Sequence, residues 1–231
     1  MPESNLSRFH LWLERQRRDP FVKNARIKSY RCRSAFKLLQ INNSMLEGGL
    51  IRPGDTVVDC GASPGSWTQV AVDLSSPGGT VLSLDIQDFE PIEGAICLPK
   101  TDIRQTAEVT RIIKEKLGCA RGVDVVLSDI APTATGIPDL DHPNLINLAQ
   151  RLALHISRPG ASLLIKLWSC PEVDDFKRLL ERIYLGPSTN SRGSGTWDKS
   201  PAVRILKPKA SRQESAEIYV CARGFCFAPN K

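Results

Sequence analysis

From residue 56 to residue 222, short apolar runs alternate with stretches of helical periodicity, and this alternation limits the fold more than any other feature. The runs predict seven strands, at residues 56–61, 79–86, 95–99, 123–130, 161–168, 203–208 and 216–222. The stretches between them predict helices at residues 64–74, 104–117, 141–157 and 172–184. Strands that are apolar throughout must be covered on both faces, which is typical of a mostly parallel sheet in an α/β fold. The last two strands follow each other closely and are expected to be antiparallel.

The N-terminal segment is strongly basic, and two helices are expected in it, at residues 5–18 and 30–46. Residues 1–37 contain ten Lys and Arg residues against three acidic ones, whereas the formal net charge of the whole chain is only +6. A nearly neutral body with a basic end favours an acidic polymer as partner. The simpler alternative is a solvated helix face, and charge alone does not choose between the two.

Cysteine, histidine and apolar patterns exclude several classes of protein. The seven cysteines form no Cys-x-x-Cys pair and do not cluster with the three histidines, so neither a disulfide framework nor a metal site is expected. This usage is typical of a reduced intracellular protein. No apolar run reaches the roughly 18 residues of a membrane span, and the N-terminus lacks the apolar core of a signal peptide.

The sequence DCGASPGSW, residues 59–67, follows the first predicted strand and opens the next helix. Ligands of open α/β sheets bind beyond the carboxyl ends of the strands, and Gly61 and Gly65 permit a close approach to the backbone there. Pro64 suits the first helical turn. The glycine spacing matches neither the dinucleotide motif G-x-G-x-x-G nor a P-loop, so the turn alone is a moderate signal for a nucleoside ligand.

Two aspartates at neighbouring strand ends strengthen that interpretation. Asp85 ends the second strand, where a carboxylate can accept both hydroxyls of a ribose. Asp102 follows the third strand and is placed to meet an adenine amino group. Either aspartate could instead cap a helix, as Asp102 could for the helix expected from residue 104.

A cation interrupts the apolar run ASLLIKLW at residues 161–168. Lys166 ends this strand, Asp129 ends the one before it, Glu217 begins the last strand, and Lys37 lies in the helix before the sheet. Lys166 alone could simply extend its ammonium group to water. Together the four suit removal of a proton from an alcohol, because burial and a second cation lower the pKa of a lysine from about 10.4. Lys166 is then the expected base, Lys37 the second cation, and the two carboxylates orient both ammonium groups.

These residues stand in motifs that also occur together elsewhere, namely RCRSAFKLLQI, VVDCGASPGSW, LSDIAP, SLLIKLW and KPKASRQESAEIYV. With them the chain, from about Tyr30 to Gly224, resembles the FtsJ (RrmJ) family of S-adenosylmethionine-dependent ribose 2′-O-methyltransferases. The resemblance implies a Rossmann-like class I methyltransferase fold: a seven-stranded, mostly parallel sheet with an antiparallel last strand and helices on both faces. It implies a catalytic tetrad of Lys37, Asp129, Lys166 and Glu217. It also implies that S-adenosyl-L-methionine is bound by Pro64, Gly65, Ser66, Trp67, Asp85, Asp102 and Asp129.

Within that family, the N-terminal sequence looks most like the mitochondrial branch, which modifies a uridine in the peptidyl-transferase region of large-subunit rRNA. The resemblance therefore implies rRNA as the partner, bound through the basic N-terminal segment, and a mitochondrial location, with a cytoplasmic or nuclear one as the alternative. A monomer is favoured. Three parts are expected: a basic extension with a helix at 1–29, a methyltransferase domain at 30–224 with an inserted loop at 185–201, and a C-terminal tail at 225–231.

Other functions stay open at the level of sequence. Enzymes of the same family that act on tRNA or on mRNA caps share the tetrad, so these four residues do not choose the RNA. A ribosome-assembly factor that binds rRNA without chemistry is a second alternative. A nicotinamide-dependent oxidoreductase is a third, which the missing G-x-G-x-x-G motif disfavours.

Overall fold

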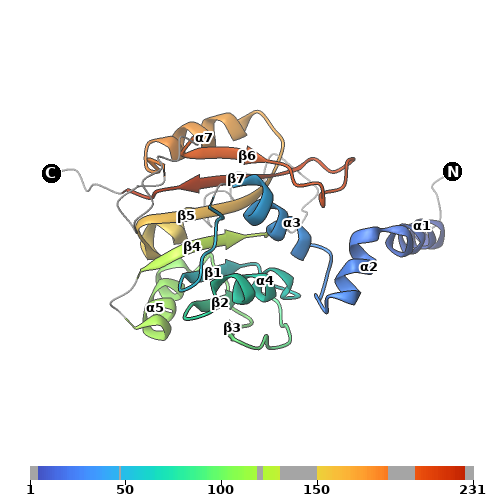
Figure 1. Ribbon diagram of the computed structural model, residues 1–231, viewed down its shortest axis with the longest axis horizontal. Coiled ribbons are helices and arrows are strands. Elements are labelled where there is room, and N and C mark those ends of the chain that lie inside the picture. Colours follow the sequence, from blue (N-terminus) through green and yellow to red (C-terminus); the bar gives the residue numbers. More distant parts are fainter. Residues whose placement is uncertain (1–4, 47, 119–121, 131–149, 187–200, 227–231) are drawn as a thin grey trace.

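A seven-stranded sheet with helices on both faces forms the body of the protein, as the sequence predicts (Figure 1). The computed structural model describes residues 5–46, 48–118, 122–130, 150–186 and 201–226. The strands are β1 (Thr56–Cys60), β2 (Thr80–Leu84), β3 (Ala95–Leu98), β4 (Val123–Ser128), β5 (Ser157–Trp168), β6 (Val203–Leu206) and β7 (Glu217–Arg223). The helices are α1 (Asn5–Arg18), α2 (Pro20–Ile27), α3 (Ala35–Gln40), α4 (Ser66–Ser75), α5 (Thr106–Leu117) and α7 (Glu172–Glu181), with a π-helical turn, η1, at Ile41–Met45.

The strand order is β3-β2-β1-β4-β5-β7-β6. Neighbours from β3 to β5 pair in parallel, whereas β7 pairs antiparallel with both β5 and β6. The expectation of a mostly parallel sheet with an antiparallel last strand is therefore confirmed. The chain proceeds outward from β1 to β3 and then returns to β4, so the order reverses between β1 and β4, where open α/β sheets bind their ligands.

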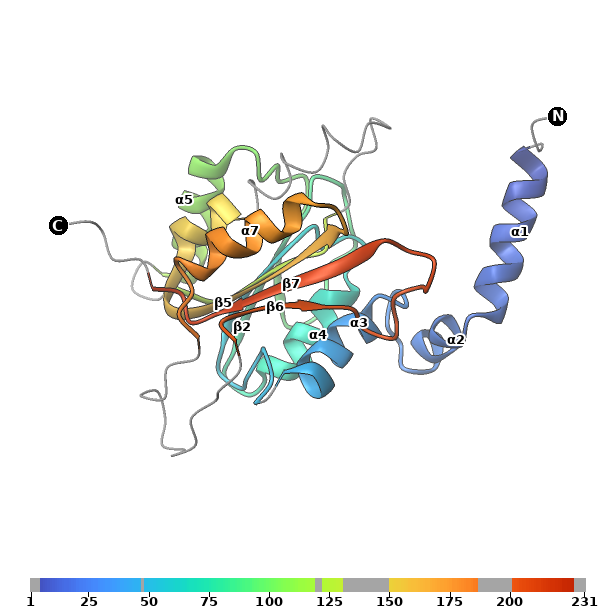
Figure 2. The ribbon, with the colours of Figure 1, turned by 90° about the horizontal axis from the view of Figure 1, so that it is seen from above.

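Two apolar clusters cover the two faces of the sheet. Residues of α3, η1 and α4 pack on one face, and residues of α5, of the helical segment 150–156 and of α7 pack on the other (Figure 2). Adjacent residues of β1 divide between them, since Val57 belongs to the first cluster and Val58 to the second. Burial on both faces explains why the strands are apolar throughout instead of alternating.

The N-terminal region departs from the prediction. The helix expected at 30–46 begins only at Ala35, and α2 was not predicted. The Asp19 carboxylate accepts hydrogen bonds from the backbone N–H groups of Phe21 (2.9 Å) and Val22 (3.4 Å), and Pro20 occupies the first turn. An aspartate followed by proline is a helix-start signal from which α2 could have been predicted. Both views place α1 at the end of the molecule away from the sheet (Figures 1 and 2).

The π-helical turn that follows α3 contains a buried amide. Asn42 is only 5% exposed. Its Oδ1 accepts hydrogen bonds from the backbone N–H groups of Leu50 (2.9 Å) and Ile51 (2.8 Å). The amide thus satisfies buried donors of the connection that leads into β1, which fixes that connection against the end of the helix.

Two boundaries near functional residues also differ from expectation. Strand β5 begins at Ser157, because residues 158–161 bulge out between the pairs Val123–Ser157 and Val125–Ser162 instead of ending a helix. Helix α4 begins at Ser66 with Gly65 at its N-cap, so Pro64 precedes the helix and is not in its first turn.

Most of the helix expected at 141–157 and of the loop expected at 185–201 lies outside the described residues. No helix within the described ranges is long and apolar enough to cross a membrane.

A carboxyl group is buried in the centre of the sheet. Asp59 of β1 has no exposed surface; its Oδ2 accepts a hydrogen bond from Thr68 Oγ1 (2.7 Å), while its Oδ1 has no partner among the described residues. Burial, together with the charges of Asp129 and Asp85, raises the pKa of Asp59 to about 7 in spite of the Thr68 hydrogen bond. An unpaired buried carboxylate is unfavourable, so folding favours the protonated form.

This predicts a stability that falls as the pH rises. The unfolded pKa of an aspartate is about 3.9, so between that pH and pH 7 the folded state binds more protons than the unfolded state. The free energy of unfolding should then decrease by at most about 1.4 kcal/mol per pH unit. Asp59→Asn should remove this decrease in urea unfolding between pH 5 and pH 7, whereas Asp88→Asn, a change at an exposed carboxylate, should leave it. Equal pH dependence in wild type and Asp59→Asn would contradict the assignment.

Candidate active site

Three strands bring polar side chains to one edge of the sheet. Asp129 directly follows β4, Lys166 lies near the carboxyl end of β5, and Glu217 begins β7. In the antiparallel pairing of β5 and β7, Lys166 lies opposite Tyr219 and Trp168 lies opposite Glu217. Because side chains two residues apart point to the same face, Lys166, Tyr219 and Glu217 share the face that α3 covers.

The four residues of the predicted tetrad form two ion pairs in one cluster. Lys37 Nζ lies 2.7 Å from Glu217 Oε1 and 2.8 Å from Oε2. Lys166 Nζ lies 2.9 Å from Asp129 Oδ1 and donates a hydrogen bond to the Asp129 carbonyl oxygen at 2.6 Å. The four side chains are between 10% and 17% exposed. Replacing one partner of an ion pair this deeply buried is strongly destabilising, because the remaining charge is left uncompensated.

The electrostatics of Glu217 show that the two pairs are neighbours. Burial raises the pKa of the Glu217 carboxyl, but the hydrogen bond and charge of Lys37 outweigh it, with help from the charge of Lys166, so the net pKa is lowered. Glu217 therefore interacts with both ammonium groups. Lys37 and Lys166 lie on the same side of the sheet, as a shared site requires.

Tyr219 connects the pairs and was not singled out from the sequence. Its hydroxyl donates a hydrogen bond to Asp129 Oδ1 (3.3 Å), and its ring centroid lies 5.9 Å from Lys37 Nζ. Burial, then the charges of Asp129 and Glu217, raise the pKa of this phenol, so it stays protonated. Its position two residues after Glu217 in a strand is the sequence signal that could have identified it. Ser34 Oγ donates to the other carboxylate oxygen of Asp129 (3.3 Å).

The turn before α4 depends on two glycines at which other parts of the chain approach the backbone closely. Gly65 has φ +114°, and a Cβ there would lie 2.7 Å from Ile92 Cδ1 and 2.9 Å from Arg31 Nη1. A Cβ at Gly61 would lie 2.5 Å from Ile130 Cγ1. Only glycine fits at these two positions, because Ile92, Arg31 and Ile130 pack directly against the backbone of the turn.

The two residues after Gly65 point into the protein. Ser66 and Trp67 are each 2% exposed. Trp67 Nε1 donates a hydrogen bond to the Ser34 carbonyl oxygen (2.9 Å), and the Ser66 hydroxyl lies 3.0 Å from Cys32 Sγ. Their side chains therefore pack the helix interface, so any contact of Trp67 with a ligand is made by its backbone.

The two predicted nucleoside-binding aspartates are differently engaged. Asp85 accepts the backbone N–H of Ser63 (2.9 Å) and that of Gln87 (2.8 Å), which ties the glycine turn to the end of β2. Asp102 instead accepts three bonds from Arg104, from its backbone N–H (2.9 Å), its Nε (2.8 Å) and its Nη2 (2.6 Å). The bond from Arg104 lowers the pKa of Asp102. Asp102 does not cap α5, whose N-cap is Gln105. Its contact with adenine stays a prediction that relies on the remaining lone pairs of the carboxylate.

Arg31 is a further residue that sequence reasoning missed. Its Nη1 donates hydrogen bonds to the carbonyl oxygens of Pro64 (2.7 Å) and Glu90 (2.6 Å), and its Nη2 donates to that of Pro91 (2.7 Å). One guanidinium thus joins the glycine turn to the loop before β3. Nothing in the sequence indicates backbone carbonyls as partners, so no local signal could have identified this contact. Among the described residues, no group of three His, Cys, Asp or Glu side chains could hold a metal ion.

Comparison with known sequences agrees with this geometry. The family model of FtsJ-like methyltransferases matches residues 30–194. The protein "rRNA methyltransferase 2, mitochondrial" of Drosophila melanogaster is 40% identical over 225 residues, which cover 93% of this chain and 82% of that protein. The "Ribosomal RNA large subunit methyltransferase E" of Paramagnetospirillum magneticum is 38% identical over 223 residues, which cover 93% and 82%.

Solved structures show the same fold at lower identity. A Plasmodium falciparum chain assigned as a ribosomal RNA methyltransferase superposes with a TM-score of 0.67 at 22% identity, covering 85% of this chain and 98% of that one. Fibrillarin from Aeropyrum pernix, solved with natively bound S-adenosyl-L-methionine, superposes with a TM-score of 0.51 at 13% identity, covering 82% and 73%. The structures establish the architecture, and the sequence matches establish the descent: the chain belongs to the FtsJ-like methyltransferase family.

Proposed function

We propose that this protein transfers the methyl group of S-adenosyl-L-methionine to a ribose 2′-OH of rRNA, specifically a uridine of mitochondrial large-subunit rRNA. The names of its relatives support rRNA and the mitochondrion. The observation that carries the proposed chemistry is the buried Lys166 ammonium, which Asp129 holds beside the Lys37–Glu217 pair. The basic N-terminal segment supplies cations for the RNA backbone.

The residues around the glycine turn fit a cationic nucleoside cofactor. Asp85 accepts the backbone N–H of Ser63 in this turn, and the charges of Asp85 and Asp129 both raise the pKa of the buried Asp59 in the strand before it. Carboxyl groups at the ends of neighbouring strands favour a positively charged ligand. When bound, S-adenosyl-L-methionine supplies an electrophilic methyl group carried by a cationic sulfur.

The tetrad handles the proton of the alcohol. In this proposal the Lys166 ammonium first releases a proton to solvent, and the neutral amine then accepts the proton from O2′, so that the oxygen can accept the methyl group. Asp129 holds Lys166 in place, and the Tyr219 hydroxyl in turn holds the Asp129 carboxylate. Lys37 remains a cation beside Glu217 and stabilises the negative charge that develops on O2′. Positioning of the base within hydrogen-bond reach supplies a further part of the rate.

Lys166→Met tests this assignment, because methionine keeps the buried stem and removes the amine. Transfer of labelled methyl groups to an rRNA transcript should fall by roughly 10²–10⁴-fold, the range of general-base catalysis. The affinity for S-adenosyl-L-methionine, measured by calorimetry, should change less than about twofold, because Lys166 is not assigned to the cofactor. Lys177→Met, a change at a half-exposed lysine of α7, is the matched control. Near-normal methylation by Lys166→Met would remove Lys166 as the base.

The target is tested by mapping 2′-O-methyl groups in cells that lack this protein. One methylated uridine of mitochondrial large-subunit rRNA should be lost, and wild type but not Lys166→Met should restore it. Loss of a mark on tRNA or on an mRNA cap would instead establish one of the alternative substrates. Rescue of ribosome assembly by Lys166→Met without methylation would identify a separate role as an assembly factor.

Arg31 should act as a positioning residue for the cofactor, because it fixes both the glycine turn and the 90–91 segment. Arg31→Lys can replace only part of its three carbonyl contacts. The Kd for S-adenosyl-L-methionine should rise about fivefold to tenfold, whereas kcat at saturating cofactor and the KM for RNA should stay within about twofold. Arg111→Lys on α5 is the control. An unchanged cofactor affinity in Arg31→Lys, measured by calorimetry, would show that the turn holds its shape without the guanidinium.

A further inference from the structure

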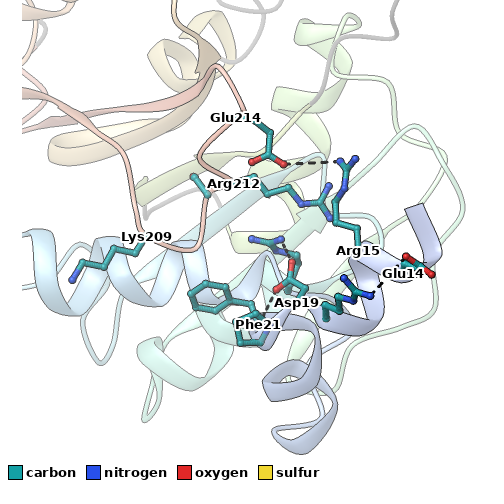
Figure 3. A pocket seen from close by; sticks show the side chains of 11 residues that line it. Glu14, Arg15, Asp19, Phe21, Lys209, Arg212 and Glu214 are labelled. Carbon is teal, nitrogen blue, oxygen red and sulfur yellow. Dashed lines mark hydrogen bonds and ion pairs between the residues drawn. The ribbon is translucent and has the colours of Figure 1, made fainter. Parts of the chain in front are cut away.

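A cavity of about 560 Å³ lies between the N-terminal helices and the β6–β7 connection. One wall is the end of α1 and the start of α2, and the other is the segment from Lys209 to Glu214 (Figure 3). Ligand sites in proteins have volumes of roughly 300–1,000 Å³, so a unit the size of a nucleotide fits. Neither the tetrad nor the glycine turn lines this cavity, so it is distinct from the site of methyl transfer.

The lining is basic, with five cations and three carboxylates: Arg15, Arg18, Arg33, Lys209 and Arg212 against Glu14, Asp19 and Glu214. The Arg33–Asp19 pair is buried, with side chains 16% and 9% exposed. The pairs Arg15–Glu214 and Arg18–Glu14 are 4.0 Å long, and their side chains are more than half exposed. Ion pairs of this kind contribute little, so Arg15 and Arg18 can exchange a carboxylate for another anion.

Arg212 completes the basic character of the cavity. Its side chain forms no ion pair among the described residues. Figure 3 shows Arg15 and Arg212 reaching toward each other from opposite walls, with Glu214 beside them. Guanidinium groups facing each other across a gap are unfavourable alone and favourable around a shared phosphate, which each can bind in bidentate fashion.

The β6–β7 connection, which lines the cavity, leads along the chain to Glu217 of the tetrad. Arg33 bonds both the Asp19 carboxylate and the carbonyl oxygen of Ala210, which joins the start of α2 to the β6–β7 connection. The next residue, Ser211, lines the cavity and is 6% exposed. Arg212 lies five residues before Glu217, a span of at most about 18 Å. A strand of RNA that leaves the tetrad therefore reaches the cavity within a few nucleotides.

We propose that this cavity binds the backbone of a single-stranded nucleotide that flanks the target ribose, with its phosphate held between Arg15 on α1 and Arg212 on the β6–β7 connection. The proposal rests on the proposed function and adds a second contact point to it. Bound phosphate displaces Glu214 from Arg15. Because guanidinium groups read phosphate and not base, this contact sets affinity and register, not sequence.

The test compares variants of the full chain on an rRNA transcript and on a short oligouridylate. Arg15→Gln with Arg212→Gln should raise the RNA KM by roughly tenfold or more. The slope of log K against log salt should become shallower by about 0.7 for each phosphate that the variant no longer neutralises. At saturating RNA, kcat should change less than about twofold, as should the cofactor Kd. Glu214→Gln should change affinity in the opposite direction, because it removes the competitor of the phosphate.

Variants of two further arginines distinguish phosphate binding in this cavity from a general effect of net charge on RNA affinity. Arg17→Gln removes the same charge from α1 at a position that does not line the cavity, and should weaken RNA binding much less than Arg15→Gln. Arg111→Gln on the opposite face of the sheet is the control for net charge. Equal losses of affinity at Arg15 and Arg17, or an affinity that does not respond to Glu214→Gln, would overturn the proposal while leaving the methyl transfer intact.

The outcomes also distinguish other failures. If wild type transfers no methyl group to any RNA, the proposed function fails and the cavity is not the cause. If the double variant binds free RNA normally and loses activity only on a ribosomal particle, the cavity receives an acidic protein segment and the RNA proposal is wrong.

Discussion

The site depends on one constraint, the antiparallel register between β5 and β7. This register sets Lys166 opposite Tyr219 and Glu217 opposite Trp168. The side chains of Lys166, Tyr219 and Glu217 therefore lie together on the otherwise apolar face that α3 covers. Four charges are then compatible with burial only because they form two pairs that share neighbours. Loss of any one member leaves a charge without compensation, which makes the cluster a unit and not a sum of four contributions.

The sequence predicts the sheet well, because strand formation here is a local property. Six of the seven strands end within two residues of their predicted bounds at both ends. The exception is β5, where Pro159 and Gly160 have the composition of a helix stop but lie in a bulge inside the strand. Helix α2 was missed although Asp19 and Pro20 mark its start. These errors arise where a local signal has two structural meanings and tertiary pairing selects one.

The charged residues of the candidate site could be predicted from the sequence, whereas the residues that hold them in position could not. Lys37, Asp129, Lys166 and Glu217 stand out because charge in an apolar setting is conspicuous. Tyr219 does not, since a tyrosine in a strand is ordinary. Arg31 and Arg33 act on backbone carbonyls of distant loops, and Ala210 is 177 residues from Arg33. Contacts of that kind depend on the assembled fold, so no local sequence pattern predicts them.

Asp59 has a consequence for turnover. A cation that binds beside Asp85 and Asp129, whose charges act on Asp59, favours the ionised form of this buried acid. Cofactor uptake near neutral pH would therefore expel a proton, and affinity would strengthen in mildly alkaline solution. Departure of the methyl leaves an uncharged thioether, which gains nothing from the same carboxylates. These carboxyl groups would thus retain the cofactor that still carries its methyl group and release the demethylated product. This discrimination by charge needs no movement of the protein.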